Sequence, residues 1–181
     1  MKKQYLITVI SLFLFVTLSS GSFAMDYQHT LDTKDMQFSW TIEADQIHVQ
    51  LSAKTTGWVA IGFDPESVME GANIIIGVAK DDKAKIEDHY GNRKRGHEND
   101  TELGGTSDVL NPSGSEKDGV TTIAFTLPLK TEDKFDKEIK TEGMYRIMLA
   151  HGAGKDSFKS RHPYRAVYDV NFSTGENKKI K

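Results

Sequence analysis

The sequence predicts an all-β fold, an antiparallel β-sandwich, on the basis of three observations. Apolar and polar residues alternate with a period of two over several short segments. Residues that favour turns separate these segments, and the periodicity of a helix is almost absent. Many short strands without intervening helices are typical of two antiparallel sheets packed face to face.

The clearest predicted strand is Gln46–Ala53, in which apolar and polar residues alternate strictly. A second strand at 58–63 follows the turn-forming residues 54–57, so the two strands form a predicted hairpin. Further strands are predicted at residues 73–79, 84–90, 120–127, 144–151 and 166–172, with a turn at 81–83.

Three other segments are predicted to be irregular. Residues 91–119 are rich in Gly, Asn, Asp and Ser, and we interpret them as a long surface loop that carries function. Residues 131–140 are charged and can form at most one or two helical turns. Residues 173–181 are polar and are expected to be frayed.

The first 24 residues have the features of a cleavable secretory signal peptide. Lys2 and Lys3 precede an apolar stretch at 5–18, and Ser22 and Ala24 are the small residues that a signal peptidase reads. The stretch is shorter than the roughly 20 residues of a membrane-spanning helix, and no second long apolar run follows. We therefore expect cleavage after Ala24 and a soluble, exported single domain, residues 25–181, in the periplasm or outside the cell.

Composition excludes several classes of site. The chain has no cysteine, so disulfides, thiolate metal sites and covalent attachment of haem are ruled out. Its formal net charge is −3, which becomes −5 without the two lysines of residues 1–24, and it has no basic cluster that would suit nucleic acid. The sequence contains neither G-x-S-x-G nor a phosphate-binding loop. A stand-alone enzyme is therefore the least expected function.

Six histidines are candidates for metal binding or proton transfer. His29 and His48 are interpreted as surface residues, since His48 lies on the polar face of its strand. His89 and His97 stand among acidic residues that could join them at a divalent-metal site, although their spacing matches no specific zinc pattern. These acidic residues are Asp88, Glu98 and Asp100.

The other two histidines, together with one methionine, suggest a different chemistry. His151 continues the buried face of its strand and is interpreted as a hydrogen-bonded residue at the strand end. His162 precedes Pro163 in a connection held by the scaffold, which favours a role as a ligand. Met69 lies in the turn before the strand at 73–79. A thioether and an imidazole together can hold a six-coordinate haem iron.

Several motifs, taken in order and spacing, resemble the DOMON domain family. They are GWVAIGF at 57–63, MEGANIIIG at 69–77, IEDHY at 86–90, GVTTIAFTLPL at 119–129, DKFD at 133–136, and His162 followed by Arg165. The family includes the N-terminal domain of dopamine β-monooxygenase and, more distantly, the cytochrome domain of cellobiose dehydrogenase. The resemblance implies an immunoglobulin-like β-sandwich over nearly all of residues 25–181.

The resemblance also implies a cofactor. Members that bind haem b hold its iron with a methionine and a histidine, and these positions fall on Met69 and His162, with His151 as the alternative histidine. The implied function is electron transfer with a separate redox partner protein. Candidate walls for the porphyrin are Trp58, Phe63 and Tyr164. The sequence departs from the family pattern at Asn73, where an acidic residue is usual, and at Ala166, where glycine is usual.

Other family members are proposed to bind sugars or to serve as modules without a small ligand. The alternative expectation is therefore a carbohydrate-binding or interaction module. Its stacking surfaces would be exposed aromatic residues such as Tyr90, Phe158 or Tyr164.

Overall fold

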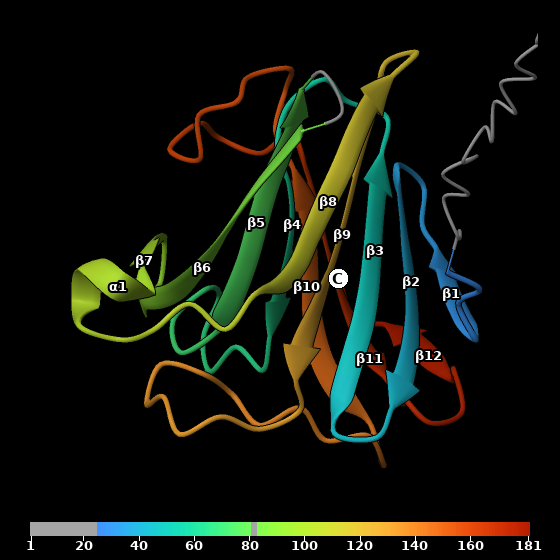
Figure 1. Cartoon of the computed structure of the whole chain (residues 1–181), viewed down its shortest axis with the longest axis vertical. Helices are drawn as coiled ribbons and strands as arrows, with labels where there is room; N and C mark the ends of the chain where they lie inside the picture. Colours follow the sequence, from blue (N-terminus) through green and yellow to red (C-terminus); the bar gives the residue numbers. More distant parts are fainter. Residues whose placement is uncertain (1–24, 81–82) are drawn as a thin grey trace, which may run out of the picture.

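The computed structural model describes residues 25–80 and 83–181, whose strands form two antiparallel sheets packed face to face (Figure 1). The first sheet contains β1 (His29–Asp32), β2 (Met36–Glu43), β3 (Gln46–Ala53), β9 (Val120–Pro128) and β8 (Leu110–Lys117), in that order. The second contains β12 (Asn177–Lys179), β11 (Tyr164–Val170), β10 (Tyr145–His151), β4 (Val59–Phe63), β5 (Asn73–Lys80), β6 (Lys83–Arg93) and β7 (Gly96–Asn99). The predicted antiparallel sandwich is confirmed.

The main core lies between the two sheets. Every second residue of β3 is buried, as its alternating sequence predicts, and its partner β2 brings Phe38 and Trp40 into the same layer. Phe172, just after β11, meets both of these rings, and Phe63 of β4 meets Phe172; both phenylalanines are fully buried. The sandwich is therefore held by a continuous aromatic and aliphatic layer.

The second sheet also carries apolar residues on its outer face, where a sandwich usually presents polar side chains to water. The buried residues Trp58, Ala60 and Ile76 form a separate cluster there. The half-buried side chains that pack against it are Val78, Ala150 and Phe158. Phe158 belongs to the β10–β11 loop, residues 152–163, which covers this outer-face cluster.

Several predictions of individual elements were wrong. The predicted hairpin of residues 46–53 and 58–63 does not form, because β3 and β4 belong to different sheets. Residues 91–119, predicted to be a loop, contain the end of β6, β7, the short helix α1 (Asp100–Leu103) and β8. Strand β8 is mostly exposed, so its sequence is polar and shows no apolar alternation. The expected frayed tail contains β12, and β1 and β2 lie where no strand was predicted. Residues 131–140 form no helix, which is compatible with the prediction of at most one or two helical turns.

Two expectations lie wholly or partly outside the described residues: the signal peptide at 1–24, and the turn at 81–83, of which only Lys83 is described. Among the described residues, no helix has the length and apolar character needed to cross a membrane.

Candidate functional site

Met69 lies half-buried in the β4–β5 turn, residues 64–72. Its N–H donates to the carbonyl of Lys94 over 3.3 Å, and its own carbonyl accepts from the N–H of Ala72 over 3.1 Å. Gly91 lies so close that a Cβ there would overlap the Met69 carbonyl oxygen. The turn is therefore fixed to the end of β6 and to the hairpin that joins β6 and β7.

Trp58 positions the other predicted ligand. It is 4% exposed, and its Nε1–H donates to Ser160 Oγ over 2.8 Å. The imidazole of His162 meets the indole edge to face, with ring centroids 6.4 Å apart. The start of the same loop is fixed by Thr55, whose hydroxyl donates to the carbonyl of Gly152 over 2.6 Å. His162 is thus held over the outer face of the second sheet rather than in a free loop.

Electrostatics around His162 favour a neutral imidazole. Burial lowers the pKa of His162, and the charges of Arg165 and His151 lower it further, against an opposing contact with its own backbone. Burial also lowers the pKa of His97, to about 4, and the charges of His89 and His162 contribute. His97 on β7 therefore lies within electrostatic range of His162.

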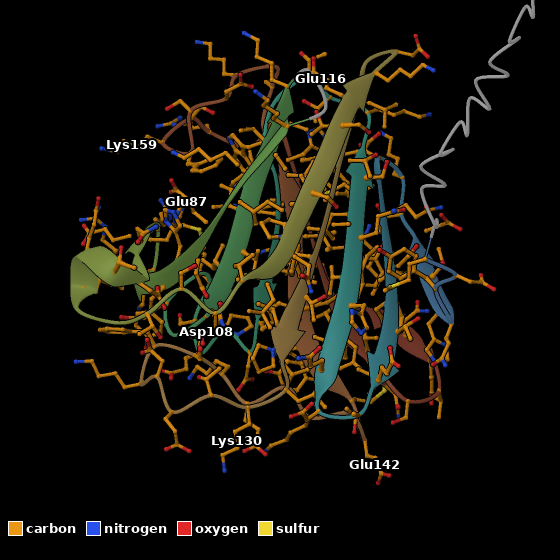
Figure 2. All side chains as sticks on the ribbon, in the orientation of Figure 1. Glu87, Asp108, Glu116, Lys130, Glu142 and Lys159 are labelled. Carbon is orange, nitrogen blue, oxygen red and sulfur yellow. The ribbon has the colours of Figure 1, made fainter. Side chains whose placement is uncertain are left out.

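A short chain of hydrogen bonds runs beside the outer-face cluster. Glu87 Oε2 lies 2.9 Å from His89 Nε2, and His89 Nδ1 lies 2.9 Å from His97 Nδ1. A carboxylate only accepts, so His89 Nε2 donates to Glu87, and a neutral His89 then accepts from His97. The ring of Phe158 meets His89 edge-on at 6.0 Å. Figure 2 shows Glu87 of β6 and Lys159 of the β10–β11 loop on the same flank of the molecule.

His151 lies in a different environment. It is 7% exposed and stacks on Tyr164, with centroids 5.4 Å apart and an interplanar angle of 13°. Its Nδ1 lies 3.0 Å from the carbonyl of Gly152. Tyr164 packs against the main core, as does Phe63. These two candidate walls therefore lie on the opposite face of the sheet from Trp58, because side chains alternate along a strand.

The aromatic residues expected to stack on sugars already contact other groups. Tyr90 lies against Phe135, with centroids 5.2 Å apart, and is half-buried. Phe158 contacts His89, and the ammonium group of Lys85 lies 5.4 Å from its ring. Tyr164 is covered on one side by His151.

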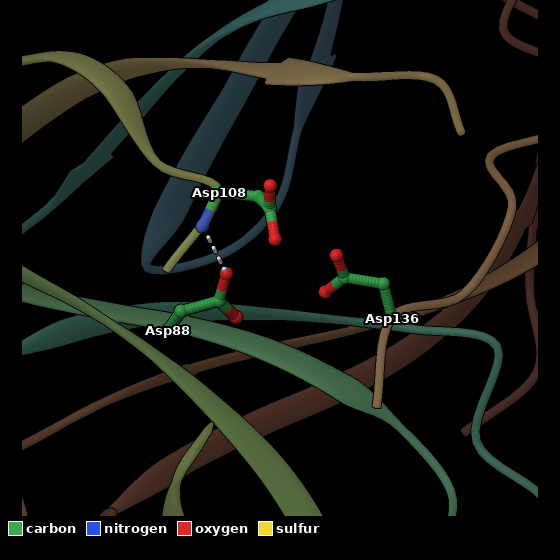
Figure 3. A group of neighbouring side chains, drawn as sticks. All are labelled: Asp88, Asp108 and Asp136. Atoms are coloured by element: carbon green, nitrogen blue, oxygen red, sulfur yellow. Dashed lines mark hydrogen bonds between the residues drawn. The ribbon is translucent and has the colours of Figure 1, made fainter. Parts of the chain in front are cut away.

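The predicted mixed site of histidines and acids does not form. Asp88 and His89 are neighbours on β6, so their side chains point to opposite faces, His89 outward and Asp88 inward. Asp88 instead meets Asp108 and Asp136 (Figure 3). Sequence analysis missed both of these partners, because they come from irregular segments far apart in the chain. The environment of His48 also differs from the expected solvated surface: its Nδ1 lies 2.8 Å from Thr126 Oγ1, and its side chain is only 13% exposed.

Burial raises the pKa of several inward-facing carboxyl groups. It raises that of Asp88 to about 8, with the charges of Asp136 and Asp100 adding to the effect. The pKa of Asp100 rises to about 7, first through burial and then through Asp136 and Asp133. The pKa of Asp136 also rises to about 7 through burial, and contact with Asp108 raises it further.

Comparison with known proteins connects this geometry to a family. The sequence model of the DOMON domain matches residues 32–152. DBH-like monooxygenase protein 1 of Homo sapiens is 28% identical over 136 residues, which cover 74% of this chain and 21% of that protein. The Mus musculus protein of the same name is 26% identical over 136 residues, with the same coverage. The match thus spans about a fifth of the length of these relatives.

Solved structures show the same fold. The cytochrome b domain of pyranose dehydrogenase from Coprinopsis cinerea superposes with a TM-score of 0.61 and 13% identity, covering 77% of this chain and 78% of that one. The cytochrome domain of Myriococcum thermophilum cellobiose dehydrogenase gives a TM-score of 0.56 and 9% identity, covering 81% and 82%. The immunoglobulin-like sandwich implied by the sequence motifs is confirmed, and the chain belongs to the DOMON domain family.

Proposed function

We propose that this chain is an exported electron-transfer module that binds haem b through Met69 and His162. The observation that supports the proposal is that both residues lie near the same hairpin, which joins β6 and β7. The Met69 backbone bonds Lys94 in the β6–β7 hairpin, and His97 of that hairpin lies within electrostatic range of His162. The hairpin therefore links the two candidate ligands.

The apolar character of the outer face is compatible with a flat, apolar cofactor. Ala60 and Ile76 lie on the outer face of the sheet, and Gly62 beside them is crowded by the Met148 side chain, whose Cε would lie 2.8 Å from a Cβ at that glycine. Because Ala60 and Gly62 are small, they project few side-chain atoms from this face of the sheet. The half-buried Phe158 of the β10–β11 loop packs against the same face. A thioether and an imidazole at its margins form a donor set suited to haem iron.

Bound haem would supply a reversible one-electron couple. The chain's own residues would hold it: Met69 and His162 would bind the iron, and Trp58 would position the imidazole through their edge-to-face contact. His162 is supported over His151 as the ligand, because His151 is stacked under Tyr164 and lies against the Gly152 carbonyl. A Met/His pair with no open iron position suits electron exchange with a redox partner protein better than catalysis.

Carbohydrate binding is less well supported. Tyr90, Phe158 and Tyr164 are each half-buried and already contact another ring, which leaves less ring surface for stacking on a sugar. Export is part of the proposal because residues 1–24 have the features of a signal peptide. It is tested by expressing the full chain in a bacterium and sequencing the N-terminus of the periplasmic protein. A mature protein beginning at Met25 is expected.

The test of haem binding is titration of haem-free protein with haemin, followed by reduction and absorption spectroscopy. We expect a saturable low-spin Soret band, with a sharp α band in the reduced state. Met69→Leu and His162→Asn should each convert the spectrum to a high-spin form, because one axial ligand is lost.

Matched controls separate ligation from general damage. Met144→Leu alters an exposed methionine, and His48→Asn alters a histidine on the other sheet, so both should leave the spectrum unchanged. His151→Asn tests the alternative histidine. Absence of saturable haem uptake, or identical spectra for the wild type and both ligand variants, would end the proposal.

A further inference from the structure

Three carboxyl groups from separate segments converge at one end of the sandwich, on its interior side. Asp88 lies on β6, Asp108 lies between α1 and β8, and Asp136 lies in the loop after β9 (Figure 3). One oxygen from each lies within 4.8 Å of the others, and the N–H of Asp108 donates to Asp88 Oδ2 over 3.2 Å. We call these three residues the carboxylate cluster.

Buried oxygen atoms around the cluster have no protein partner among the described residues. Asp88 is 1% exposed and its Oδ1 accepts no hydrogen bond. Asn73 is 4% exposed; its amide nitrogen donates to Asp136 Oδ1 over 2.7 Å, while its Oδ1 is unpartnered. Both carboxylate oxygens of the fully buried Asp100 are unpartnered as well. Buried oxygens of this kind normally bind a proton donor, a water or a cation.

No Lys or Arg in the described part of the chain forms an ion pair with the cluster. Lys137 lines the same cavity as Asp108 and Asp136, but its ammonium group pairs with Glu66 at 2.9 Å. Asn73, Asp108 and Asp136 line a cavity of about 10 Å³, which is about the space one water molecule needs. Acidic oxygens that face one another across so small a space are stabilised by a cation or by shared protons.

We propose that the carboxylate cluster, with Asn73 Oδ1, binds a hard divalent cation of the Ca²⁺ class. All of the donors are oxygens, with no histidine or thiolate among them, which is the donor set that Ca²⁺ prefers. Carboxylate oxygens within 4.8 Å of one another can all reach one ion at the usual calcium–oxygen distance of about 2.4 Å. Water molecules would complete the shell.

The site would join parts of the chain that are distant in sequence. Asn73 begins β5 directly after the β4–β5 turn, and Asp136 belongs to the loop after β9, which is otherwise irregular. A bound cation would fasten this loop and the segment after α1 to the second sheet. This inference does not depend on haem, because the cluster faces the interior and the outer-face cluster lies on the other side of the sheet.

The experiment is thermal unfolding of haem-free full-length protein, stripped with chelator and then titrated with calcium chloride near neutral pH. We expect a saturable rise in Tm of roughly 5–10 °C at a calcium concentration about a hundred times the dissociation constant. Titration calorimetry with calcium chloride should give a stoichiometry of one. Asp88→Asn and Asp136→Asn keep the shape of the side chain but remove its charge, so each should abolish the rise.

Asp118→Asn is the matched control. Asp118 is exposed in the β8–β9 turn with φ of 53°, a conformation that asparagine also accepts, so this variant should retain the full response. Asp108→Asn, at a half-buried position, supplies a third test if either of the other variants folds poorly. A wild type that does not respond to calcium would overturn the proposal, and so would equal responses in the cluster variants and Asp118→Asn. In either case haem uptake is measured separately and is unaffected.

Discussion

The indole of Trp58 and the imidazole of His162 meet edge to face, at an interplanar angle of 89°. The same indole donates to Ser160 two residues earlier, so one buried side chain holds the β10–β11 loop at two points. Gly152, at the start of that loop, packs so tightly on Trp58 that a Cβ there would lie 2.6 Å from Nε1. The position of His162 therefore depends on packing against Trp58.

Trp58→Phe should loosen this loop. The change removes the hydrogen bond to Ser160 and part of a buried ring, so we expect a loss of roughly 2 kcal/mol in the free energy of unfolding. Ser160→Ala removes the hydrogen bond alone and should cost about 1 kcal/mol. Urea unfolding measures both losses. Limited proteolysis should cut residues 153–163 faster in Trp58→Phe, and equal cleavage rates in the two variants would contradict the role given to the indole.

Gly91→Ala should displace Met69. The added methyl group would overlap the Met69 carbonyl oxygen, and that carbonyl is held in place by the N–H of Ala72. Overpacking against backbone should cost more than about 2 kcal/mol in urea unfolding. In the haem-loaded protein the spectrum should shift towards that of Met69→Leu.

Gly119→Ala provides the comparison for Gly91→Ala. Gly119 has open space around it but φ of 77°, so alanine there should cost only about 1 kcal/mol through backbone strain and leave the haem spectrum unchanged. If Gly91→Ala behaves like Gly119→Ala in both measurements, the close contact with Met69 does not constrain the turn.

Sequence patterns predicted most strands that bury one face, although β2, which buries Met36, Phe38 and Trp40 at a period of two, was missed. Strand β3 was predicted with its observed bounds, because each inward residue is apolar and each outward residue is polar. Strand β8 was missed, because it lies at a sheet edge and buries almost no side chain. A strand that buries almost no side chain leaves no period-two pattern, although its backbone pairs with β9 over residues 113–117 and again at Leu110.

The candidate site was predictable only where local sequence carries it. Short motifs singled out Met69, Trp58 and His162, and the structure brings Trp58 and His162 into contact. Asp108 and Asp136 were not found, because they lie in irregular segments that approach Asp88 only when the two sheets close. The sidedness of Asp88 and His89 was available from alternation along β6, and it separates the histidines from the acids.

His97 should make the protein sensitive to acid. Burial is the main cause that lowers the pKa of His97 from 6.5 to about 4. Between these pH values His97 is therefore protonated in the unfolded chain but neutral in the folded chain. The stability that this neutral imidazole preserves is complete above about pH 6.5 and is lost as pH falls towards about 4. By about pH 5 the loss should reach about 2 kcal/mol. Urea unfolding of wild type and His97→Asn at both ends of this range measures it.

The comparison between the two proteins is essential, because other groups titrate with the opposite sign. The raised pKa values of Asp88, Asp100 and Asp136 stabilise the folded chain as pH falls, in the wild type and the variant alike. The difference between the two curves isolates His97. Parallel curves from about pH 8 to about pH 5 would show that the folded state protonates His97 freely.

Phe172 should be among the side chains that contribute most to stability. It is fully buried and its ring meets Trp40 at 5.8 Å and 90°, and Tyr145 at 5.6 Å. Phe172→Ala should lower the free energy of unfolding by roughly 3–5 kcal/mol, whereas Phe172→Leu should cost about 1–2 kcal/mol because it leaves a smaller cavity. Leu110→Ala, at a 39% exposed position, should change it by less than about 0.5 kcal/mol.

These Phe172 variants separate side-chain packing from backbone hydrogen bonding. Trp40 Nε1–H donates to the backbone carbonyl of residue 172 over 2.9 Å, and that carbonyl is present in every variant. The measured loss therefore reports the ring contacts and the cavity. If Phe172→Ala and Phe172→Leu were equally destabilised, cavity volume would not be the cause, and the strand end after β11 would have to be held by the Trp40 hydrogen bond instead.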